Sequence, residues 1–269
     1  MPLQTTADSL NSRIFSVTGG ASGIGAAVVH LLAERGAAAI WIADWNTDNF
    51  PRIKDEVAAI NSNTQIFTTK VDVSDSTQVN AWIEKIVAES GALHGSANVA
   101  GLSQPAFSTE RPAILAETDK DWDRILGVNI HGIMYCTRAQ VWAMLRLPVG
   151  SNPAIVNVSS LGSLIRGPTA FAYGTSKAAC AYFTSCVAKD VCSFGIRANV
   201  VSPGNTYTPM TKEFFGNLSK EETEQRLQQI GVSSTMLSPA DIAQVIVWLL
   251  SESSLHVNGV NLPVGEGAP

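Results

Sequence analysis

The sequence has no run of lysine or arginine and no long apolar stretch, and these absences exclude whole classes of protein. Its 18 basic and 23 acidic residues give a formal net charge of −5, which disfavours nucleic acid or an anionic membrane surface as a partner. The longest apolar runs, 37–43 and 245–250, are too short to cross a bilayer. The first residues lack the basic start and apolar core of an export signal. We therefore expect a soluble, cytoplasmic protein with no nucleic acid and no membrane as partner.

Cysteine and histidine are too few and too scattered to indicate a metal site. The four cysteines form no Cys-x-x-Cys pair, and the four histidines show no ligand spacing. The cysteines, Cys136, Cys180, Cys186 and Cys192, fall mostly in stretches that read as helical. We expect reduced, buried thiols rather than a metal centre or disulfides.

The length and composition are those of a globular α/β protein. The chain has 269 residues, of which 45% are hydrophobic, and this is enough for one domain with a large core or for two small ones. It contains no repeat, low-complexity tract or linker that would divide it. Residues 1–269 are therefore expected to form a single domain.

The segment that begins at Arg13 has the order strand, glycine turn, helix. A β-like run over 13–17 leads into a glycine-rich turn at 18–25, and apolar residues then continue at helical spacing until Gly36. Glycine has no Cβ, so the backbone can approach a pyrophosphate closely, and the free N–H groups at a helix start face its negative charge. Glycines in an arbitrary loop mean little, but this context indicates nucleotide binding.

Asp44 ends the next apolar run, 39–43, and lies 19 residues beyond the last glycine of the turn. An acidic side chain at the end of the second strand accepts hydrogen bonds from both hydroxyls of the adenosine ribose and repels a 2′-phosphate. Neither Ser22 nor the pair at 45–46 supplies the arginine or lysine that a 2′-phosphate would need. The sequence favours NAD over NADP, the alternative being that Asp44 caps a helix.

Strand-like runs and helical patterns alternate along the rest of the chain. Strands are expected at 65–71, 95–101 (running into a glycine turn), 154–160, 196–201 and near Val260, and helices at 50–60, 77–89, 121–147, from 173 onward and at 240–250. This alternation implies right-handed crossovers and a parallel sheet with helices on both faces, a Rossmann-type doubly wound α/β fold. Ligands bind beyond the carboxyl ends of such strands. Asp44, Asp72, Gly101, Ser160 and Gly204 all fall there.

Tyr173 and Lys177 are four residues apart at the start of an alanine-rich segment, so on a helix their side chains share one face. An ammonium beside a phenol favours the phenolate and suits the pair to proton exchange. Ser160, on the preceding loop, could hold the oxygen whose proton is exchanged. Taken alone, the pair is more often a half-buried tyrosine beside a solvated lysine. Asn129, on an apolar helix face, is either a structural amide or a site residue.

Together these motifs resemble the short-chain dehydrogenase/reductase family over essentially the whole chain. The resemblance rests on the glycine turn at 18–25, Asp72-Val73, Asn98-x-Ala100-Gly101, Val128-Asn129, Ser160, Tyr173-x-x-x-Lys177, and Pro203-Gly204 with Thr208. The stretches 138–141 and 172–177 also resemble the fungal branch that tailors secondary metabolites, including chanoclavine dehydrogenase-like enzymes. One departure is Val99, where the family usually has a second asparagine.

The resemblance implies an NAD(H)-dependent oxidoreductase that interconverts a secondary alcohol and a ketone, or a related alcohol/carbonyl pair. Carried over by position, Tyr173 is the general acid/base and Ser160 orients the substrate oxygen. Lys177 favours the Tyr173 phenolate and binds the nicotinamide ribose, and Asn129 holds a water in the proton relay. The cofactor would be bound by Gly19, Ser22, Gly23, Ile24, Asp44, Asp72, Val73, Asn98, Ala100, Gly101, Tyr173, Lys177, Pro203, Gly204, Thr206 and Thr208.

The substrate is expected to be a small to medium apolar molecule, including secondary metabolites. Its pocket would be lined by Leu102, Leu161, Ile165, Phe171, Met210 and Phe214, beside a mobile flap at 213–218. By family analogy the protein would be a homo-oligomer, a tetramer or a dimer. Two other classes stay open: a cofactor-binding protein without net redox change, such as an isomerase, cyclase or NAD sensor, and a pure scaffold.

Overall fold

A parallel sheet of seven strands forms the centre of the protein, in a computed structural model that describes residues 10–104, 112–165, 170–229 and 235–265. The strands lie in the order β3-β2-β1-β4-β5-β6-β7. Their bounds are β1 Ile14–Thr18, β2 Ala39–Asp44, β3 Gln65–Lys70, β4 Gly95–Asn98, β5 Ala154–Val158, β6 Arg197–Pro203 and β7 Asn261–Val264. Because the order reverses between β1 and β4, the sheet is doubly wound, and the predicted α/β fold is confirmed.

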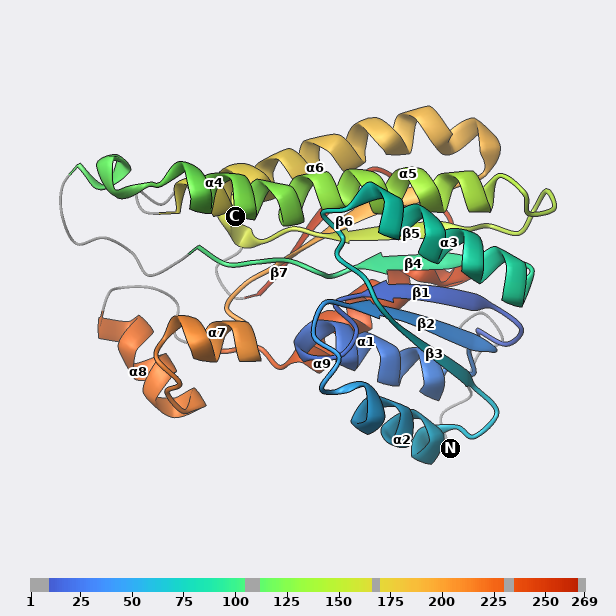
Figure 1. Cartoon of the computed structure of the whole chain (residues 1–269), viewed down its shortest axis with the longest axis horizontal. Helices are drawn as coiled ribbons and strands as arrows, with labels where there is room; N and C mark the ends of the chain where they lie inside the picture. Colours follow the sequence, from blue (N-terminus) through green and yellow to red (C-terminus); the bar gives the residue numbers. More distant parts are fainter. Residues whose placement is uncertain (1–9, 105–111, 166–169, 230–234, 266–269) are drawn as a thin grey trace.

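Helices cover both faces of the sheet (Figure 1). One face carries α1 (Gly23–Glu34), α2 (Phe50–Ile60) and α9 (Pro239–Leu250), and the other carries α3 (Ser76–Ser90), α4 (Asp119–Leu126), α5 (Ile133–Met144) and α6 (Phe171–Val191). The apolar core is split accordingly into two clusters, one on each side of the strands. Val28, Leu32 and Ile246 belong to the first, and Trp82 and Ile86 to the second.

Helix starts follow the capping residues that the sequence provides. The Asp75 carboxylate accepts hydrogen bonds from the backbone N–H groups of Thr77 and Gln78 at the start of α3. Ser238 and Asp241 form a reciprocal capping box at the start of α9. Each such cap stabilises its helix by about 1 kcal/mol, so these helix boundaries are fixed by local chemistry.

The segment predicted as one helix over 121–147 is helical in the structure, but the type of helix changes along it. A π-helical turn, Gly127–Gly132, separates α4 from α5. At Gly132 the turn packs tightly on the segment after β3, because a Cβ there would lie 2.9 Å from Cγ2 of Val73. This turn carries Asn129, which is fully buried. The apolar periodicity predicted the helix but missed the wider turn, since a single extra residue does not disturb the pattern.

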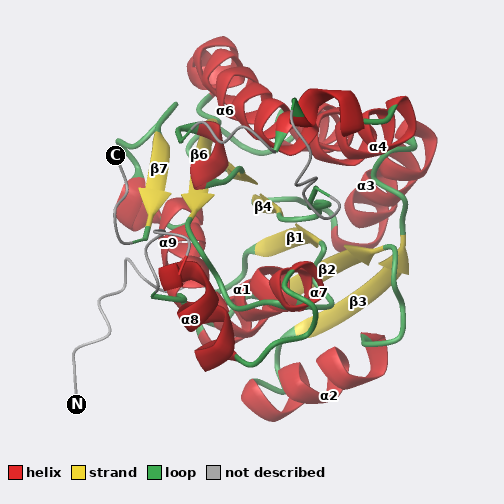
Figure 2. Ribbon diagram, turned by 90° about the vertical axis from the view of Figure 1, so that its left-hand side faces the viewer, coloured by secondary structure: helices red, strands yellow, loops and turns green. Residues whose placement is uncertain are grey.

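Two short helices, α7 (Pro209–Phe214) and α8 (Lys220–Gln229), project from the carboxyl edge of the sheet (Figures 1 and 2). The sequence did not predict α8, and it placed a flap at 213–218. In the structure α7 ends inside that range, and the rings of Phe214 and Phe215 pack edge to face with centroids 5.0 Å apart. Both rings are half-buried rather than exposed.

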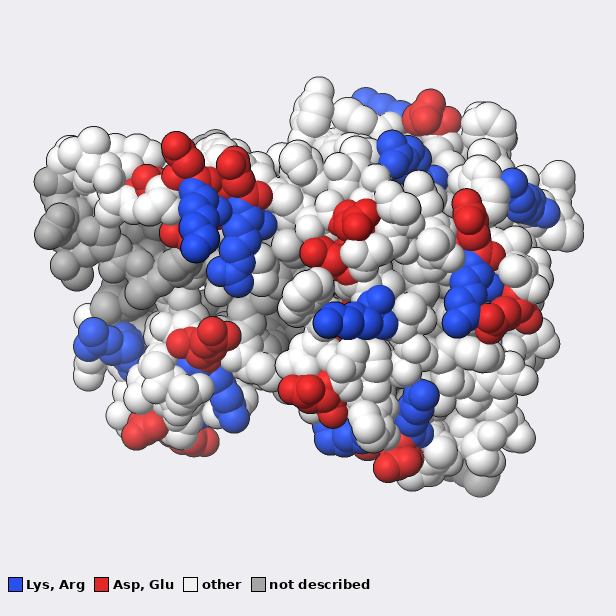
Figure 3. All heavy atoms as spheres, viewed as in Figure 1, with Lys and Arg blue, Asp and Glu red and all other residues white. Residues whose placement is uncertain are grey.

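Acidic and basic side chains lie intermixed on the face of the molecule shown in Figure 3. Several of them pair along helices, as Arg52 does with Glu56 at 2.7 Å. None of the helices that the structure describes combines the length and the apolar character needed to cross a membrane.

The four cysteines are free, and only two of them have the buried environment that was predicted. Cys136 and Cys180 are buried, whereas Cys186 and Cys192 are exposed on and just after α6. Burial raises the pKa of the Cys136 thiol to about 12, so this thiol is inert at neutral pH. The prediction of buried thiols was wrong for the other two, because α6 turns part of its surface outward.

Candidate active site

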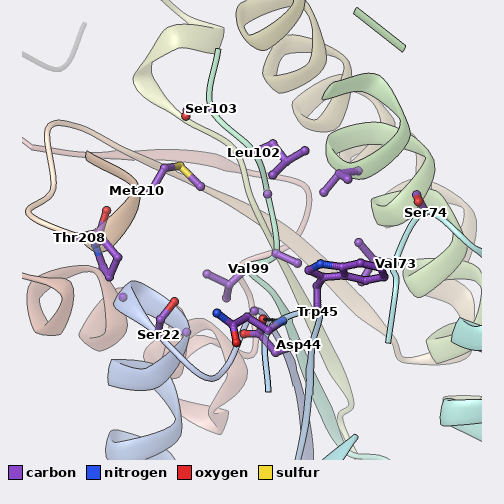
Figure 4. A pocket seen from close by; sticks show the side chains of 18 of the residues that line it. Ser22, Asp44, Trp45, Val73, Ser74, Val99, Leu102, Ser103, Thr208 and Met210 are labelled. Atoms are coloured by element: carbon purple, nitrogen blue, oxygen red, sulfur yellow. Dashed lines mark hydrogen bonds between the residues drawn. The ribbon is translucent and has the colours of Figure 1, made fainter. Parts of the chain in front are cut away.

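A cavity of about 980 Å³ opens at the carboxyl edge of the sheet (Figure 4). Thr208 and Met210 lie on one wall, and Val73 and Ser74 on the opposite one. Six segments line it: the glycine turn (Gly19, Ser22, Gly23, Ile24, Gly25), the end of β2 and the loop after it (Ala43, Asp44, Trp45, Asn46), residues 71–74, residues 99–104, the start of the π turn (Gly127, Val128) with Asp123 and Arg124, and Thr208 with Pro209, Met210, Glu213 and Phe214 of α7. Its volume lies at the upper end of the range typical of ligand pockets.

The glycine turn can accept only glycine at its critical positions. Gly19 has a positive φ of 66°, and a Cβ there would lie 2.9 Å from the backbone of Ala100. A Cβ at Gly25 would lie 2.1 Å from the Gly19 carbonyl oxygen. Ser22, the N-cap of α1, does not use its side chain as a cap, so the N–H groups at the start of α1 can face an anion in the cavity.

Asp44 is held between the glycine turn and the loop after β2. Its Oδ2 accepts a hydrogen bond from the Ala21 N–H at 3.1 Å, and its Oδ1 accepts one from the Asn46 N–H at 3.0 Å. Burial raises the pKa of Asp44, while these backbone hydrogen bonds act in the opposite direction. Asp44 caps no helix, since the N-cap of α2 is Asn49. The carboxylate lines the cavity, where it can accept hydrogen bonds from a ligand's hydroxyl groups.

Lys70 approaches this end of the cavity, a position that the sequence did not predict. Its strand, β3, pairs with β2 so that Lys70 lies opposite Asp44. The ammonium lies 4.7 Å from the ring centroid of Trp45, which is 63% exposed. Only strand pairing reveals this neighbour, because Lys70 is far from Asp44 along the chain.

Lys177 and Asn129 meet behind Gly101 at the cavity wall. A Cβ at Gly101 would lie 3.4 Å from Nζ of Lys177 and 3.3 Å from Oδ1 of Asn129. Lys177 is only 5% exposed, and its ammonium donates a hydrogen bond to the Val158 carbonyl at 3.0 Å. The same nitrogen lies 5.7 Å from the centroid of the Tyr173 ring. Lysine, asparagine and tyrosine are therefore brought together as predicted.

Ser160 joins this group from the loop after β5. A Cβ at Gly162 would lie 3.5 Å from Oγ of Ser160 and 3.6 Å from Cε1 of Tyr173, so the hydroxyl and the ring flank one small residue. The Ser160 Oγ accepts a hydrogen bond from the Gly162 N–H at 3.1 Å. Neither Ser160 nor Tyr173 lines the 980 Å³ cavity, whereas Lys177 reaches its wall at Gly101.

The oxygen and both amide hydrogens of Asn129 take part in hydrogen bonds that organise the site. Its Oδ1 accepts from the Leu102 N–H at 2.8 Å, and its Nδ2 donates to the Leu102 carbonyl at 2.9 Å and to Oγ of Ser176 at 3.1 Å. Since both amide hydrogens are taken, the side chain holds the loop after β4 against α6. The sequence left open whether Asn129 is a structural amide or a site residue. In the structure it is an amide with structural hydrogen bonds that also lies at the site.

Asn98 was predicted to bind the cofactor, but its side chain points into the core. Its amide nitrogen donates to Gln140 at 2.9 Å and to Asn157 at 2.8 Å, and its oxygen accepts from Gln140 at 2.8 Å. Asn98 is 1% exposed and does not line the cavity. The Asn98 side chain therefore links β4, β5 and α5 and does not face the cavity.

The residues at the end of β6 and just after it also divide between core and cavity. Thr208 lines the cavity and caps α7, whereas Thr206 is buried and its hydroxyl donates to the Gly204 carbonyl at 3.0 Å. Pro203 and Gly204 do not line the cavity either, and Gly204 packs on Leu161. Of the four residues predicted to bind cofactor in this segment, only Thr208 faces the cavity.

The remaining predicted site residues are placed as follows. Asp72 lines the cavity, but its Oδ1 also accepts hydrogen bonds from the N–H and hydroxyl of Ser74 at 2.9 and 2.6 Å, which shapes the turn into α3. Of the predicted apolar lining, Leu102, Met210 and Phe214 face the cavity, and Leu161, Ile165 and Phe171 do not. Over the described ranges, no three His, Cys, Asp or Glu side chains are grouped to hold a metal ion.

Comparison with known proteins gives matches over almost the full length of the chain. A family model described as Enoyl-(Acyl carrier protein) reductase matches residues 19–268. Chanoclavine-I dehydrogenase of Arthroderma otae is 48% identical over 264 residues, 97% of this chain and 99% of that protein. Chanoclavine-I dehydrogenase of Penicillium roqueforti is 46% identical over 262 residues, with the same shares covered. The crystal structure of levodione reductase matches with a TM-score of 0.86 at 25% identity, over 96% of this chain and 98% of that one.

Proposed function

Because the chain belongs to the short-chain dehydrogenase/reductase family, we propose that it is an NAD(H)-dependent enzyme that interconverts an alcohol and a carbonyl compound, with Tyr173 as general acid/base. Its relatives are dehydrogenases that act on CH–OH groups, and this chain is an enzyme of that kind. The observation that carries the proposal is the position of Lys177, which lies beside Gly101 on the wall of a glycine-lined cavity and 5.7 Å from the ring of Tyr173. Tyr173 and Ser160 in turn flank Gly162.

The residues of the cavity fit a nicotinamide dinucleotide. The free N–H groups at the start of α1 suit a pyrophosphate, and the space at Gly19 and Gly25 admits no Cβ. The Asp44 carboxylate, fixed by two backbone N–H groups, suits the two hydroxyls of an adenosine ribose, which supports NAD over NADP. When bound, the cofactor supplies the hydride acceptor or donor of the reaction.

The protein's own side chains would supply the proton transfer that accompanies the hydride. In the oxidation of an alcohol, the Tyr173 phenolate takes the hydroxyl proton as the hydride leaves the carbinol carbon, and in the reduction it returns that proton. The Ser160 hydroxyl holds the reacting oxygen. The Lys177 ammonium, 5.7 Å from the Tyr173 ring and nearly out of contact with water, stabilises the phenolate.

The substrate we propose is a small to medium, largely apolar alcohol of secondary metabolism. Leu102, Met210 and Phe214 give the cavity an apolar part that suits such a molecule. Chanoclavine-I is named as the substrate of relatives that are 46–48% identical to this chain. It is therefore the first candidate to test.

The decisive experiment measures NADH formation by the purified protein with NAD⁺ and a panel of alcohols that includes chanoclavine-I. We expect absorbance from NADH with at least one alcohol and the reverse change with the matching carbonyl compound. Reactions without alcohol, and with NADP⁺ in place of NAD⁺, serve as controls. A protein that binds NADH but turns over no member of the panel in either direction would favour an isomerase, cyclase or sensor instead.

We also propose that the enzyme acts in the cytoplasm as a homo-oligomer, a dimer or tetramer. Exposed free thiols at Cys186 and Cys192 suit a reducing compartment. Exposed apolar side chains near the ends of α5 and α6, Trp142, Leu145 and Phe194, suit a contact between copies of the chain. Light scattering of the purified protein gives the mass that tests the oligomer.

A further inference from the structure

The backbone N–H of Tyr173 has a hydrogen-bond partner that lies 69 residues away in the sequence. Tyr173 is the third residue of α6, a position whose N–H has no partner within the helix. The N-cap, Ala170, has no side chain that could accept this hydrogen bond. Oε1 of Gln104 accepts it at 3.1 Å. Gln104 thus does for α6 what a capping residue normally does, from the loop after β4.

Glu117 fixes the orientation of the Gln104 amide. Nε2 of Gln104 donates to both carboxylate oxygens of Glu117, at 3.1 and 3.0 Å. A carboxylate accepts but cannot donate hydrogen bonds, so it turns the NH₂ group toward itself and the amide oxygen toward Tyr173. All three residues are half-buried, and the pairing with an ionised group strengthens the bond.

The other side of the Tyr173 backbone is held by the same loop. The Tyr173 carbonyl accepts a hydrogen bond from the Ser176 hydroxyl at 2.7 Å, and Oγ of Ser176 in turn accepts one from Nδ2 of Asn129 at 3.1 Å. Asn129 in turn binds both backbone groups of Leu102. Leu102 and Gln104 are two residues apart, so one short loop is linked to both backbone groups of Tyr173. Gln104 binds the N–H directly, and Leu102 is linked to the carbonyl through Asn129 and Ser176.

We infer that Gln104 is a positioning residue that fixes the backbone of Tyr173 against the cavity, with Glu117 orienting it. Gln104 itself lines the cavity, so the loop that faces a bound ligand is tied directly to the residue that exchanges the proton. An error of about 1 Å in such a group can lower turnover by about 100-fold. The inference rests on the proposed function of Tyr173.

The test compares Gln104→Leu, Gln104→Glu, Glu117→Gln and the double variant Gln104→Glu/Glu117→Gln. Leucine at 104 removes the acceptor, and we expect kcat to fall about 10-fold to 100-fold, with the NADH dissociation constant changed by less than about twofold. Hydrogen–deuterium exchange of the Tyr173 amide should become about fivefold faster. Gln225→Leu, at an exposed glutamine on α8, should leave all three quantities as in the unmodified protein.

The double variant separates this contact from a general loss of stability. Glutamate at 104 keeps an acceptor for Tyr173 but sets two carboxylates against each other, so this single variant should lose turnover. Adding Glu117→Gln restores a donor to that carboxylate, and both kcat and the slow amide exchange should recover. If Gln104→Leu does not fold, the Gln104→Glu variant and its rescue test the same contact.

Unchanged kcat and Tyr173 exchange in Gln104→Leu would overturn the inference, and so would a double variant no better than Gln104→Glu alone. Failure of the proposed function has a different signature, because the unmodified protein would then turn over no alcohol or carbonyl compound. Exchange at the Tyr173 amide does not depend on activity, so it decides the role of Gln104 in either case.

Discussion

The ammonium nitrogen of Lys177 lies 5.7 Å from the centroid of the Tyr173 ring while it donates a hydrogen bond to the Val158 carbonyl. Val158 ends β5, so this bond ties the first turns of α6 to the carboxyl edge of the sheet. A buried ammonium is costly unless it is paired with other polar groups. Lys177 therefore holds a positive charge at one fixed place beside the phenol.

Removing the Tyr173 hydroxyl should abolish turnover without disturbing the fold. Tyr173→Phe keeps the ring and loses the group that exchanges the proton, so we expect kcat to fall about 10²-fold to 10⁴-fold. The NADH dissociation constant, from a fluorescence titration, should stay nearly unchanged. Tyr182→Phe is the matched control, because Tyr182 lies on the same helix and is 76% exposed. Turnover of Tyr173→Phe at the control level would remove Tyr173 from the mechanism.

Asp44 should control the choice between NADH and NADPH. In Asp44→Ala the repulsion of a 2′-phosphate is lost, while the Lys70 ammonium remains beside Trp45, so NADH binding should weaken and NADPH binding should tighten. We expect the ratio of the two dissociation constants to change by at least about 10-fold, or about 1.4 kcal/mol. Asp48→Ala, at an exposed position on the same loop, should keep the original ratio. Tighter binding of NADPH than of NADH by the unmodified protein would contradict the assignment.

NADH affinity should fall on mild acidification because of the same carboxylate. Burial raises the pKa of Asp44, so this aspartate protonates at a higher pH than the usual value of about 3.9. Only the ionised form accepts hydrogen bonds from both ribose hydroxyls at once. Dissociation constants measured from about pH 8 to about pH 4 should rise as the pH approaches this raised pKa. Asp44→Asn should bind more weakly but without that rise, and equal pH profiles for the two proteins would exclude Asp44 as the titrating group.

The buried amide network around Asn157 should contribute to stability. Nδ2 of Asn157 donates to Oγ1 of Thr184 at 2.8 Å, and its Oδ1 accepts from Asn98 at 2.8 Å. Asn157→Leu removes one hydrogen bond from Thr184 and one from Asn98, both of which are buried. This should lower the free energy of unfolding by about 1–3 kcal/mol for each donor or acceptor left unsatisfied. Urea denaturation measures the change. Asn80→Leu, at an exposed site on α3, should have little effect, and a similarly small effect of Asn157→Leu would show that the network is not needed.

The parts of the site that the sequence predicted are those encoded by neighbouring residues. The glycine turn is recognisable because strand, turn and helix follow one another, and Asp44 because it ends an apolar run. Tyr173 and Lys177 share a helix face by spacing alone. In each case a local pattern contains both the residue and the reason for its place, and the structure brings Ser160, Asn129, Tyr173 and Lys177 together at one edge.

The parts that the sequence missed depend on pairing between distant segments. Gln104 contacts Tyr173 across 69 residues, and Lys70 reaches Trp45 only because β3 lies beside β2. The direction of the Asn98 side chain was missed for the same reason. Its amide could face either the cavity or the core, and the choice is made by Gln140 on α5 and Asn157 on β5. No periodicity within a single segment indicates such partners.

His94 should make the fold less stable below neutral pH, since its ring is held in the neutral form. Its Nδ1 accepts a hydrogen bond from the Ile14 N–H at 3.1 Å, which requires that this nitrogen carry no proton. Burial lowers the pKa of His94, and the positive charge of Arg13 lowers it further. An unfolded histidine takes up a proton near pH 6.5. Between the lowered folded value and about 6.5 the unfolded state binds more protons, so the free energy of unfolding decreases as the pH falls.

Urea denaturation at about pH 7 and about pH 5, on either side of the unfolded histidine pKa, measures this loss, with His94→Asn as the test variant. Asparagine can still offer an oxygen to the Ile14 N–H but does not titrate, so its free energy of unfolding should depend less on pH than that of the unmodified protein. His256→Asn is the matched control, because His256 is exposed and its replacement should leave the pH dependence in place. An equal loss of stability in His94→Asn would mean that the acid sensitivity comes from another group, whatever the geometry at Ile14.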